Sequence, residues 1–197
     1  MRYLGKIVRL QVQVDSIKTG ERPHQIYTPV PNLTSVPVLR LTADGVEGID
    51  QSGTILPDVH NRTHPHSKFR GDNGVSICFT EHYRRMRDRY GDHLTNGIAG
   101  ENMLIDHDIT VSYEEIAHGV VIRGDDREIT IGPWDIAHPC APFSKFCLRM
   151  TPDEKPDKRI TETLQFLENG TRGFVAVYDD EAGVAEICVG DEVWLVG

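Results

Sequence analysis

Apolar and polar residues alternate with a period of two near the start of the chain. Between residues 6 and 14 the apolar positions are Val8, Leu10, Val12 and Val14, and the polar positions between them are Arg9, Gln11 and Gln13. Successive side chains of a β-strand point to opposite faces, so this pattern predicts a half-buried strand.

Shorter apolar runs bounded by turn-forming residues predict the remaining strands. We expect them at 38–42, 75–79, 103–105, 120–122, 128–131, 173–178 and 192–196, with 120–122 and 128–131 forming a hairpin across Gly124-Asp125. Residues 18–37 contain four prolines and no sustained period, so a long loop or a short excursion is expected there.

Two segments have helical periodicity. Thr80 is expected to cap a helix that buries Tyr83, Met86 and Tyr90 and ends at Gly91. The arginines of this segment then form a solvated face, an interpretation favoured over an anion site; they are Arg84, Arg85, Arg87 and Arg89. A second helix is expected within 152–170, mainly over 157–169, where Ile160, Leu164 and Leu167 share one face.

Many short strands with two principal helices predict a mainly β (α+β) fold, a closed or partly closed β-barrel with attached helices. The 197 residues, 39% of them hydrophobic, are enough for one domain spanning residues 1–197. A net charge of -9 argues against a nucleic-acid or anionic-membrane partner. No stretch approaches the ~20 apolar residues that span a bilayer, so a soluble, cytoplasmic protein is expected.

Cys140 lies in an unusual setting, the stretch His138-Pro139-Cys140-Ala141-Pro142. Prolines stiffen the backbone and remove donors, which predicts an irregular segment rather than the middle of a strand. Positive charge from His138 and Lys145 would favour the reactive thiolate, and a half-buried structural cysteine is the alternative.

The chain has three other cysteines, and four in all are too few for a disulfide framework. Cys78 and Cys188 lie among apolar residues, so we expect both to be buried and inert. Cys147 either resolves an oxidised or persulfidated Cys140 or is a buried core thiol, and the second interpretation is favoured.

The long polar segment 50–74 contains His60, His64 and His66. Their spacing could bring two or three imidazoles onto a metal such as zinc, but lining of a pocket mouth is favoured. His138 is a candidate proton donor, whereas His82 is equally well explained as a structural residue.

Five motifs, taken in order, resemble the MOSC domain family, named after the C-terminal domain of molybdenum cofactor sulfurases. They are Glu81-His82-Tyr83, Gly100-Glu101-Asn102, Pro139-Cys140, Thr171-Arg172-Gly173-Phe174 and Gly190-Asp191-Glu192-Val193. The resemblance extends from about Gly5 to Val196. One segment departs from it: the early Gly-Asp-x-His-like motif is split between Gly48-Ile49-Asp50 and Asp58-Val59-His60-Asn61.

The resemblance implies a MOSC-type β-barrel in which Cys140 is the functional cysteine. In some relatives this cysteine ligates molybdenum in a pterin cofactor (molybdopterin) that reduces N-hydroxylated compounds, with His138 here as a candidate acid; in others the domain is proposed to carry sulfur as a persulfide. The cofactor can be absent from the purified protein. The residues expected to hold it are Arg62, Lys68, Arg70, Gly100, Glu101 and Asn102.

Three functions remain open at this point: a molybdenum-dependent reductase, a sulfur-transfer protein and a non-catalytic small-molecule binding module. The expected partners are a small-molecule substrate and an electron-donor or sulfur-donor protein.

Overall fold

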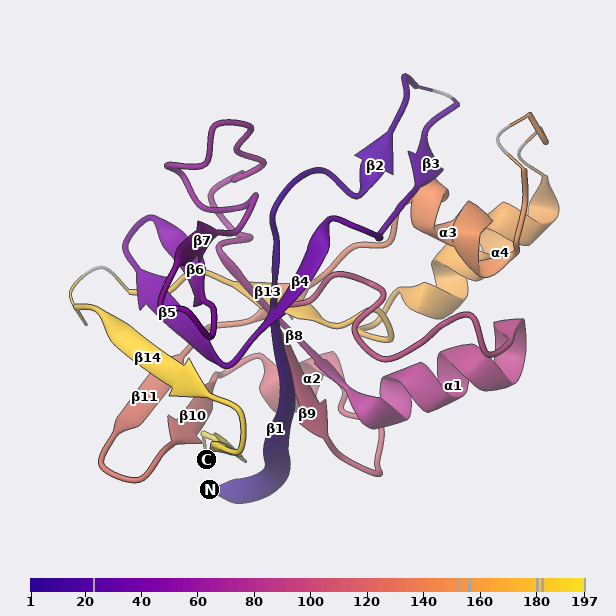
Figure 1. Ribbon diagram of the computed structural model, residues 1–197. Helices are drawn as coiled ribbons and strands as arrows, with labels where there is room; N and C mark the ends of the chain where they lie inside the picture. Colours follow the sequence, from indigo (N-terminus) through magenta and orange to yellow (C-terminus); the bar gives the residue numbers. More distant parts are fainter. Residues whose placement is uncertain (23, 152, 156, 180, 182, 197) are drawn as a thin grey trace.

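The computed structural model describes residues 1–22, 24–151, 153–155, 157–179, 181 and 183–196 (Figure 1). Its strands are β1 (Arg2–Gln13), β2 (Lys18–Thr19), β3 (Ile26–Tyr27), β4 (Leu33–Val36), β5 (Val38–Thr42), β6 (Gly45–Ile49), β7 (Ile55–Pro57), β8 (Val75–Phe79), β9 (Met103–Asp106), β10 (Val120–Arg123), β11 (Glu128–Ile131), β12 (Asp135–Ile136), β13 (Phe174–Ala176), β14 (Ala185–Cys188) and β15 (Glu192–Leu195). Its helices are α1 (Thr80–Tyr90), α2 (Tyr113–Ile116), α3 (Ala141–Cys147) and α4 (Lys158–Leu167). The predicted mainly β (α+β) class is confirmed.

The largest sheet runs in the order β11-β10-β15-β1-β9-β8-β13-β12, and β4 also pairs with β1. A second sheet has the order β14-β5-β6-β7, and β2 pairs with β3 alone. Within the part of the chain that the structure describes, these pairings leave the large sheet as an open path rather than a closed barrel. The predicted β10–β11 hairpin is present, with Val120 opposite Ile131.

Strand β1 departs from the predicted alternation. Its register against β9 shifts between Ile7 and Arg9, and Val8 is therefore 46% exposed instead of facing the core. Beyond the irregularity, Gln11 and Gln13 are buried. The two glutamines lie beside the functional site rather than in solvent.

The two principal helices form where they were predicted, and two short helices, α2 and α3, were not anticipated. Helix α1 ends at Gly91, whose positive φ of 106° favours glycine, and whose N–H donates to the Arg87 carbonyl. Thr80 does not cap α1 as expected: it is the first helical residue, and its hydroxyl donates to Asp106 and to the His107 carbonyl. None of the described helices combines the length and apolar composition needed to cross a bilayer.

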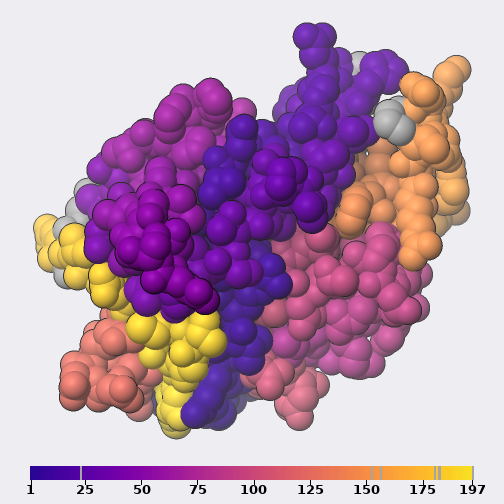
Figure 2. All heavy atoms as spheres, in the orientation of Figure 1, coloured from indigo at the N-terminus to yellow at the C-terminus, as the bar shows by residue number. Residues whose placement is uncertain are grey.

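Two apolar clusters build the interior. One fills the space between the large sheet and β5–β6, and the other joins α1 and α3 to the β3 strand and to Leu167 of α4. Figure 1 shows the three longer helices on one side of the sheet, with β2 and β3 next to α3. The space-filling view shows the β2–β3 hairpin projecting beside the orange helices (Figure 2). Cys140 lies where this hairpin meets α3.

Candidate functional site

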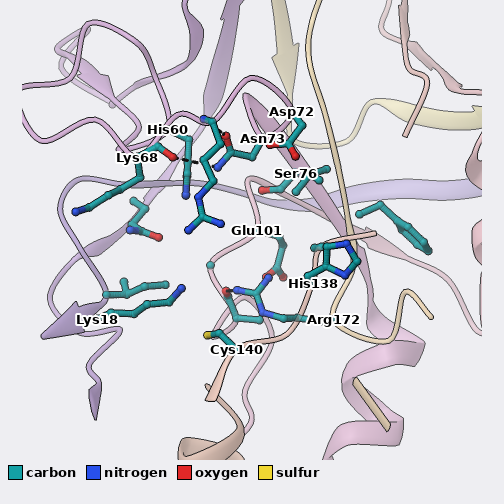
Figure 3. Close-up of a pocket in the computed structure, with 18 of the residues that line it drawn as sticks. Lys18, His60, Lys68, Asp72, Asn73, Ser76, Glu101, His138, Cys140 and Arg172 are labelled. Atoms are coloured by element: carbon teal, nitrogen blue, oxygen red, sulfur yellow. Dashed lines mark hydrogen bonds between the residues drawn. The ribbon is translucent and has the colours of Figure 1, made fainter. Parts of the chain in front are cut away.

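A cavity of about 300 Å³ opens between the β2–β3 hairpin, the 60–73 loop and the start of α3 (Figure 3). Its floor comes from β8, the turn at residues 99–101 and the start of β13. This volume is at the lower end of the range for small-molecule sites. Segments that are far apart in the sequence therefore supply one concave site.

Cys140 lines this cavity and is partly exposed. It precedes the first residue of α3 in an extended conformation, with φ of -128° and ψ of 154°, as predicted for an irregular segment. Helix α3 is held by the β2–β3 hairpin, because the Tyr27 ring packs edge-on against Phe143 with centroids 5.0 Å apart. The packing of α3 therefore positions the thiol.

Arg172 is the cation that the structure places on the same wall as Cys140. Its guanidinium lies 5.3 Å from the centre of the Phe143 ring and donates to the Ala99 carbonyl at 2.9 Å. Burial alone would lower the pKa of Arg172, but the nearby Tyr27 hydroxyl and Cys140 thiol help to hold it above its ordinary value. Arg172 therefore keeps its charge.

Gly173 lets the backbone turn directly after Arg172. Its φ is +104°, and a Cβ on this residue would lie 2.4 Å from the Ile77 carbonyl oxygen. Any other residue would push β13 away from β8 and move Arg172 with it. The Thr171–Phe174 motif predicted no role for Arg172. The signal in the sequence was the position of Arg172 between the end of a helix and the start of a strand.

Glu101 is buried in the floor of the same cavity and is only 5% exposed. Its Oε2 accepts a hydrogen bond from the Tyr83 hydroxyl at 2.7 Å, while its Oε1 has no partner among the described residues. Burial raises the pKa of Glu101, against the hydrogen bond from Tyr83 and the charge of Arg172, which lower it. The cavity thus contains an acid that holds its proton more tightly than a surface glutamate.

The turn that carries Glu101 is fixed from below by buried amides. Gln11 donates to the carbonyl oxygens of Gly97 and Glu101. Gly100 adopts φ of +88° and lines the cavity, where a Cβ would lie 2.9 Å from Ile17 Cδ1. The buried glutamines of β1 therefore have a site-building role.

Asn102 does not line the cavity, contrary to its predicted role in holding a ligand. It is 4% exposed, and its side chain donates to Asp58 at 3.0 Å and accepts from the Ser76 N–H and hydroxyl. Asp58, itself buried, also accepts from the Gln13 N–H at 2.7 Å. Asn102 therefore joins β1, β8 and the 58–60 segment beneath the cavity.

The hydrogen bond between Asn102 and Asp58 shows which half of the split motif lies near the cavity. His60 lines the cavity and Asp58 is buried beneath it, whereas Asp50 accepts from the N–H groups of Ser52 and Thr54 in an exposed turn. Sequence reasoning left both segments open because the separation of the two halves hid which one would fold back onto β1.

Four cations surround the outer part of the cavity: Lys18, Arg22, Lys68 and Arg70. Their side-chain nitrogens make no hydrogen bond or ion pair with the described residues. Asp72 is the acid on this outer wall, so positive charge is in excess there although the chain has a net charge of -9. An uncompensated cluster of this kind favours an anionic ligand.

Lys68 and Arg70 were predicted ligand-binding residues, whereas Lys18 and Arg22 were missed because the proline-rich 18–37 segment gave no periodic signal. Arg62, the third predicted cation, lies outside the cavity, with its guanidinium stacked 4.6 Å from the Phe69 ring centre. Lys145, expected near Cys140, is buried on α3 and does not line the cavity.

The three histidines of the 60–66 segment do not converge on a metal site. His60 binds the Asp58 carboxylate at 2.9 Å and lines the cavity. His64 bonds to the Val14 carbonyl and to the His66 N–H, while His66 is largely exposed. In the described ranges, no group of three or more His, Cys, Asp or Glu side chains is arranged to hold a metal ion. Only the pocket-lining interpretation, and only for His60, agrees with the geometry.

The two candidate proton donors differ in setting. His138 lines the cavity, but its side chain is 73% exposed and pairs with Glu168 at 2.7 Å. His82 is a buried residue of α1 and accepts a hydrogen bond from the Val111 N–H, and burial lowers its pKa to about 4. His82 is therefore a neutral structural residue.

The cysteines sort into two accessible and two buried thiols. Cys78 and Cys147 are buried, and burial raises the pKa of Cys147 to about 12. The burial of Cys147 favours a core thiol over a thiol that resolves an oxidised or persulfidated Cys140. Cys188 is only partly buried, contrary to expectation, because Ile187 and not Cys188 faces the core from β14.

Thiol labelling at neutral pH tests this division. Cys140 and Cys188 should react in the folded protein, and Cys78 and Cys147 only after unfolding, because a thiol must be ionised and accessible to react. Mass spectrometry of the labelled peptides over time gives the order. Labelling of Cys147 as fast as Cys140 would contradict it.

No protein-family model matches the chain, and no curated protein matches it in sequence. Several solved structures match the chain in fold. YuaD from Bacillus subtilis superposes with a TM-score of 0.60 at 12% identity, over 98% of this chain and 96% of YuaD. YiiM from Escherichia coli gives 0.51 at 15% identity over 98% and 70%, and YiiM from Geobacillus stearothermophilus gives 0.53 at 14% over 98% and 75%.

YuaD and YiiM are proteins of the MOSC type. The fold of this chain is a MOSC-type fold. Identities of 12–15% carry the fold alone, so the chemistry of the cavity has to be argued from its own residues.

Proposed function

We propose that the protein binds a molybdenum cofactor through Cys140 and reduces small N-hydroxylated compounds. The observation that carries the proposal is the cavity itself: a partly exposed thiol on one wall and, around the mouth, four cations whose side chains pair with none of the described residues. A soft thiolate suits molybdenum, and the outer cations suit the phosphate of a pterin.

The residues present fit such a group. Glu101 Oε1 and Arg172 Nε are buried atoms with no hydrogen-bond partner in the described part of the chain. Both residues line the cavity, and a buried polar atom needs a partner that a ligand can supply. Cys140 would hold the metal, and Lys18, Arg22, Lys68 and Arg70 would hold the phosphate. When bound, the cofactor passes two electrons from an electron-donor protein to the substrate.

The reaction is R₂N–OH + 2 e⁻ + 2 H⁺ → R₂N–H + H₂O. The N–O bond breaks, one proton completes the departing water and the other goes to nitrogen. The chain must therefore provide a proton at the departing oxygen, and Arg172 provides a fixed positive charge next to the thiol side of the cavity.

Metal and pterin analysis tests the proposal. Protein isolated from a host that makes the cofactor should contain molybdenum and pterin in near-equal amounts and should reduce an N-hydroxylated amidine with a chemical electron donor. Labile sulfane sulfur on Cys140 without molybdenum would replace the proposal with sulfur transfer. Neither group in such protein would favour a binding module.

The cation cluster gives a second measurement. Replacing both Lys68 and Arg70 by alanine should lower cofactor retention by about tenfold or more, because two charge-assisted contacts to the phosphate are lost. Arg62→Ala is the matched control, since Arg62 stacks on Phe69 away from the cavity. Pterin content after gel filtration at rising salt measures retention; equal losses in the control would contradict the phosphate assignment.

A further inference from the structure

Glu101 is an acid of the cavity that has no chemical role in the proposed reaction so far. Glu101 is buried, lines the cavity and has one carboxylate oxygen without a partner among the described residues. A buried carboxylate in this state is costly unless it is protonated or completed by a ligand. Gln11 holds the turn through the backbone carbonyl of Glu101 and does not bond to its side chain.

Tyr83 fixes the orientation of this acid. The Tyr83 hydroxyl donates to Glu101 Oε2 at 2.7 Å and accepts from the Ala99 N–H at 2.9 Å. Both bonds are buried, so the tyrosine hydrogen is committed to Oε2. The proton that Glu101 can exchange is therefore on Oε1.

We propose that Glu101 is the catalytic acid of this site, which gives the proton from Oε1 to the oxygen leaving the N-hydroxylated substrate, with Tyr83 as its positioning residue. The inference rests on the proposed function. In the balanced reaction the N–O bond breaks with two electrons, the departing hydroxide takes the Glu101 proton and leaves as water, nitrogen takes a proton from solvent, and solvent reprotonates Glu101.

His138 is the competing acid, and its geometry is less suited. It is 73% exposed and its Nδ1 is bound to Glu168, so the proton there is shared with a surface carboxylate. Glu101 is shielded from water, and a fixed proton donor is more effective in such a site than in solvent.

The charges around Glu101 determine how its titration responds to mutation. The groups that face it from neighbouring elements are Tyr83 of α1, Cys78 of β8, Arg9 of β1, Tyr27 of β3 and Arg172 before β13. Burial raises the pKa of Glu101, and the Tyr83 hydrogen bond lowers it. Removing the Tyr83 hydroxyl should therefore raise the pKa further.

The first experiment needs no cofactor. Infrared difference spectra of the cofactor-free protein should show a protonated carboxyl band that titrates above the ordinary glutamate range and is absent in Glu101→Gln. In Tyr83→Phe the midpoint should move to higher pH. A wild-type spectrum without such a band would overturn the proposal whether or not molybdenum binds.

The second experiment uses the loaded enzyme and follows reduction of an N-hydroxylated amidine against pH. Glu101→Gln should lower kcat by about 10²–10⁴-fold at unchanged molybdenum content, the range for loss of a general acid. In wild type the rate should fall as pH rises through the pKa of Glu101, and in Tyr83→Phe this fall should occur at higher pH.

Two control variants complete the design. Glu81→Gln changes a buried glutamate of α1 that is paired with Arg84 and does not line the cavity, and His138→Gln removes the competing acid. Glu81→Gln should keep at least about a third of the wild-type kcat, and His138→Gln should lose far less kcat than Glu101→Gln. Full activity in molybdenum-loaded Glu101→Gln, or a loss confined to His138→Gln, would overturn the acid assignment while leaving the proposed function intact. If Glu101→Gln fails to fold, an unshifted profile in Tyr83→Phe overturns it instead.

Discussion

Cys140→Ser should leave the protein folded but free of molybdenum, with N-hydroxyl reduction lowered by more than about 100-fold, beyond the loss typical for a residue that only supports a metal ligand. A serine hydroxyl does not ionise near neutral pH and is a poor ligand for a soft metal centre. The thiol lies outside any helix or strand and is partly exposed, so its replacement removes little packing. Metal content and kcat measure the first effect, and urea unfolding should differ from wild type by about 1 kcal/mol or less.

Cys188→Ser is the matched control for this variant. Cys188 is also partly buried, but it lies in β14 and does not line the cavity. It should keep both molybdenum and activity. If Cys140→Ser retains full activity, or if Cys188→Ser loses as much, Cys140 is not the functional cysteine.

Asp58→Ala should give the largest loss of stability, about 3–5 kcal/mol, because it leaves buried donors without an acceptor. Asp58 accepts from the Gln13 N–H, the Asn102 amide and the His60 ring. These bonds tie β1 to the turn that carries Glu101. Urea unfolding gives the free energy, and cofactor retention should fall with it.

The stabilising effect of Asp58 depends on pH with a defined sign. Burial would raise the pKa of Asp58, but hydrogen bonds to His60 and Gln13 hold it below the ordinary value of 3.8. A carboxyl with a lowered pKa stabilises the fold above its unfolded pKa, and the effect is lost as the pH falls through the folded pKa. The difference between wild type and Asp58→Ala should therefore shrink in acid, below about pH 3.8.

Asp50→Ala is the comparison that separates the two halves of the split motif. Asp50 lies in an exposed turn, where it accepts from Ser52 and Thr54, and its loss should cost about 1 kcal/mol or less. A loss in Asp50→Ala equal to that in Asp58→Ala would contradict the role of Asp58 beneath the cavity.

The sequence alone determined those features of the protein that depend only on neighbouring residues in the chain. Period-two and helical patterns gave the strands at 75–79 and 128–131 and the two principal helices. The Pro139–Pro142 stretch indicated an irregular segment for Cys140, and the 60–70 loop supplied Lys68 and Arg70 to the cavity. These results need only propensity, periodicity and turn chemistry.

Tertiary structure decided which residues meet. Arg172 follows a helix stop, Glu101 sits in a turn, and Lys18 and Arg22 belong to a hairpin with two-residue strands, so no local pattern links them to Cys140. The register shift in β1 exposed Val8, and Gln11 and Gln13 are buried along with Leu10 and Val12, so the predicted polar face of that strand does not face solvent there. Register and long-range packing depend on contacts between distant segments, and for that reason only the folded chain showed that Asp58 and Asn102 support the cavity while Arg62 lies outside it.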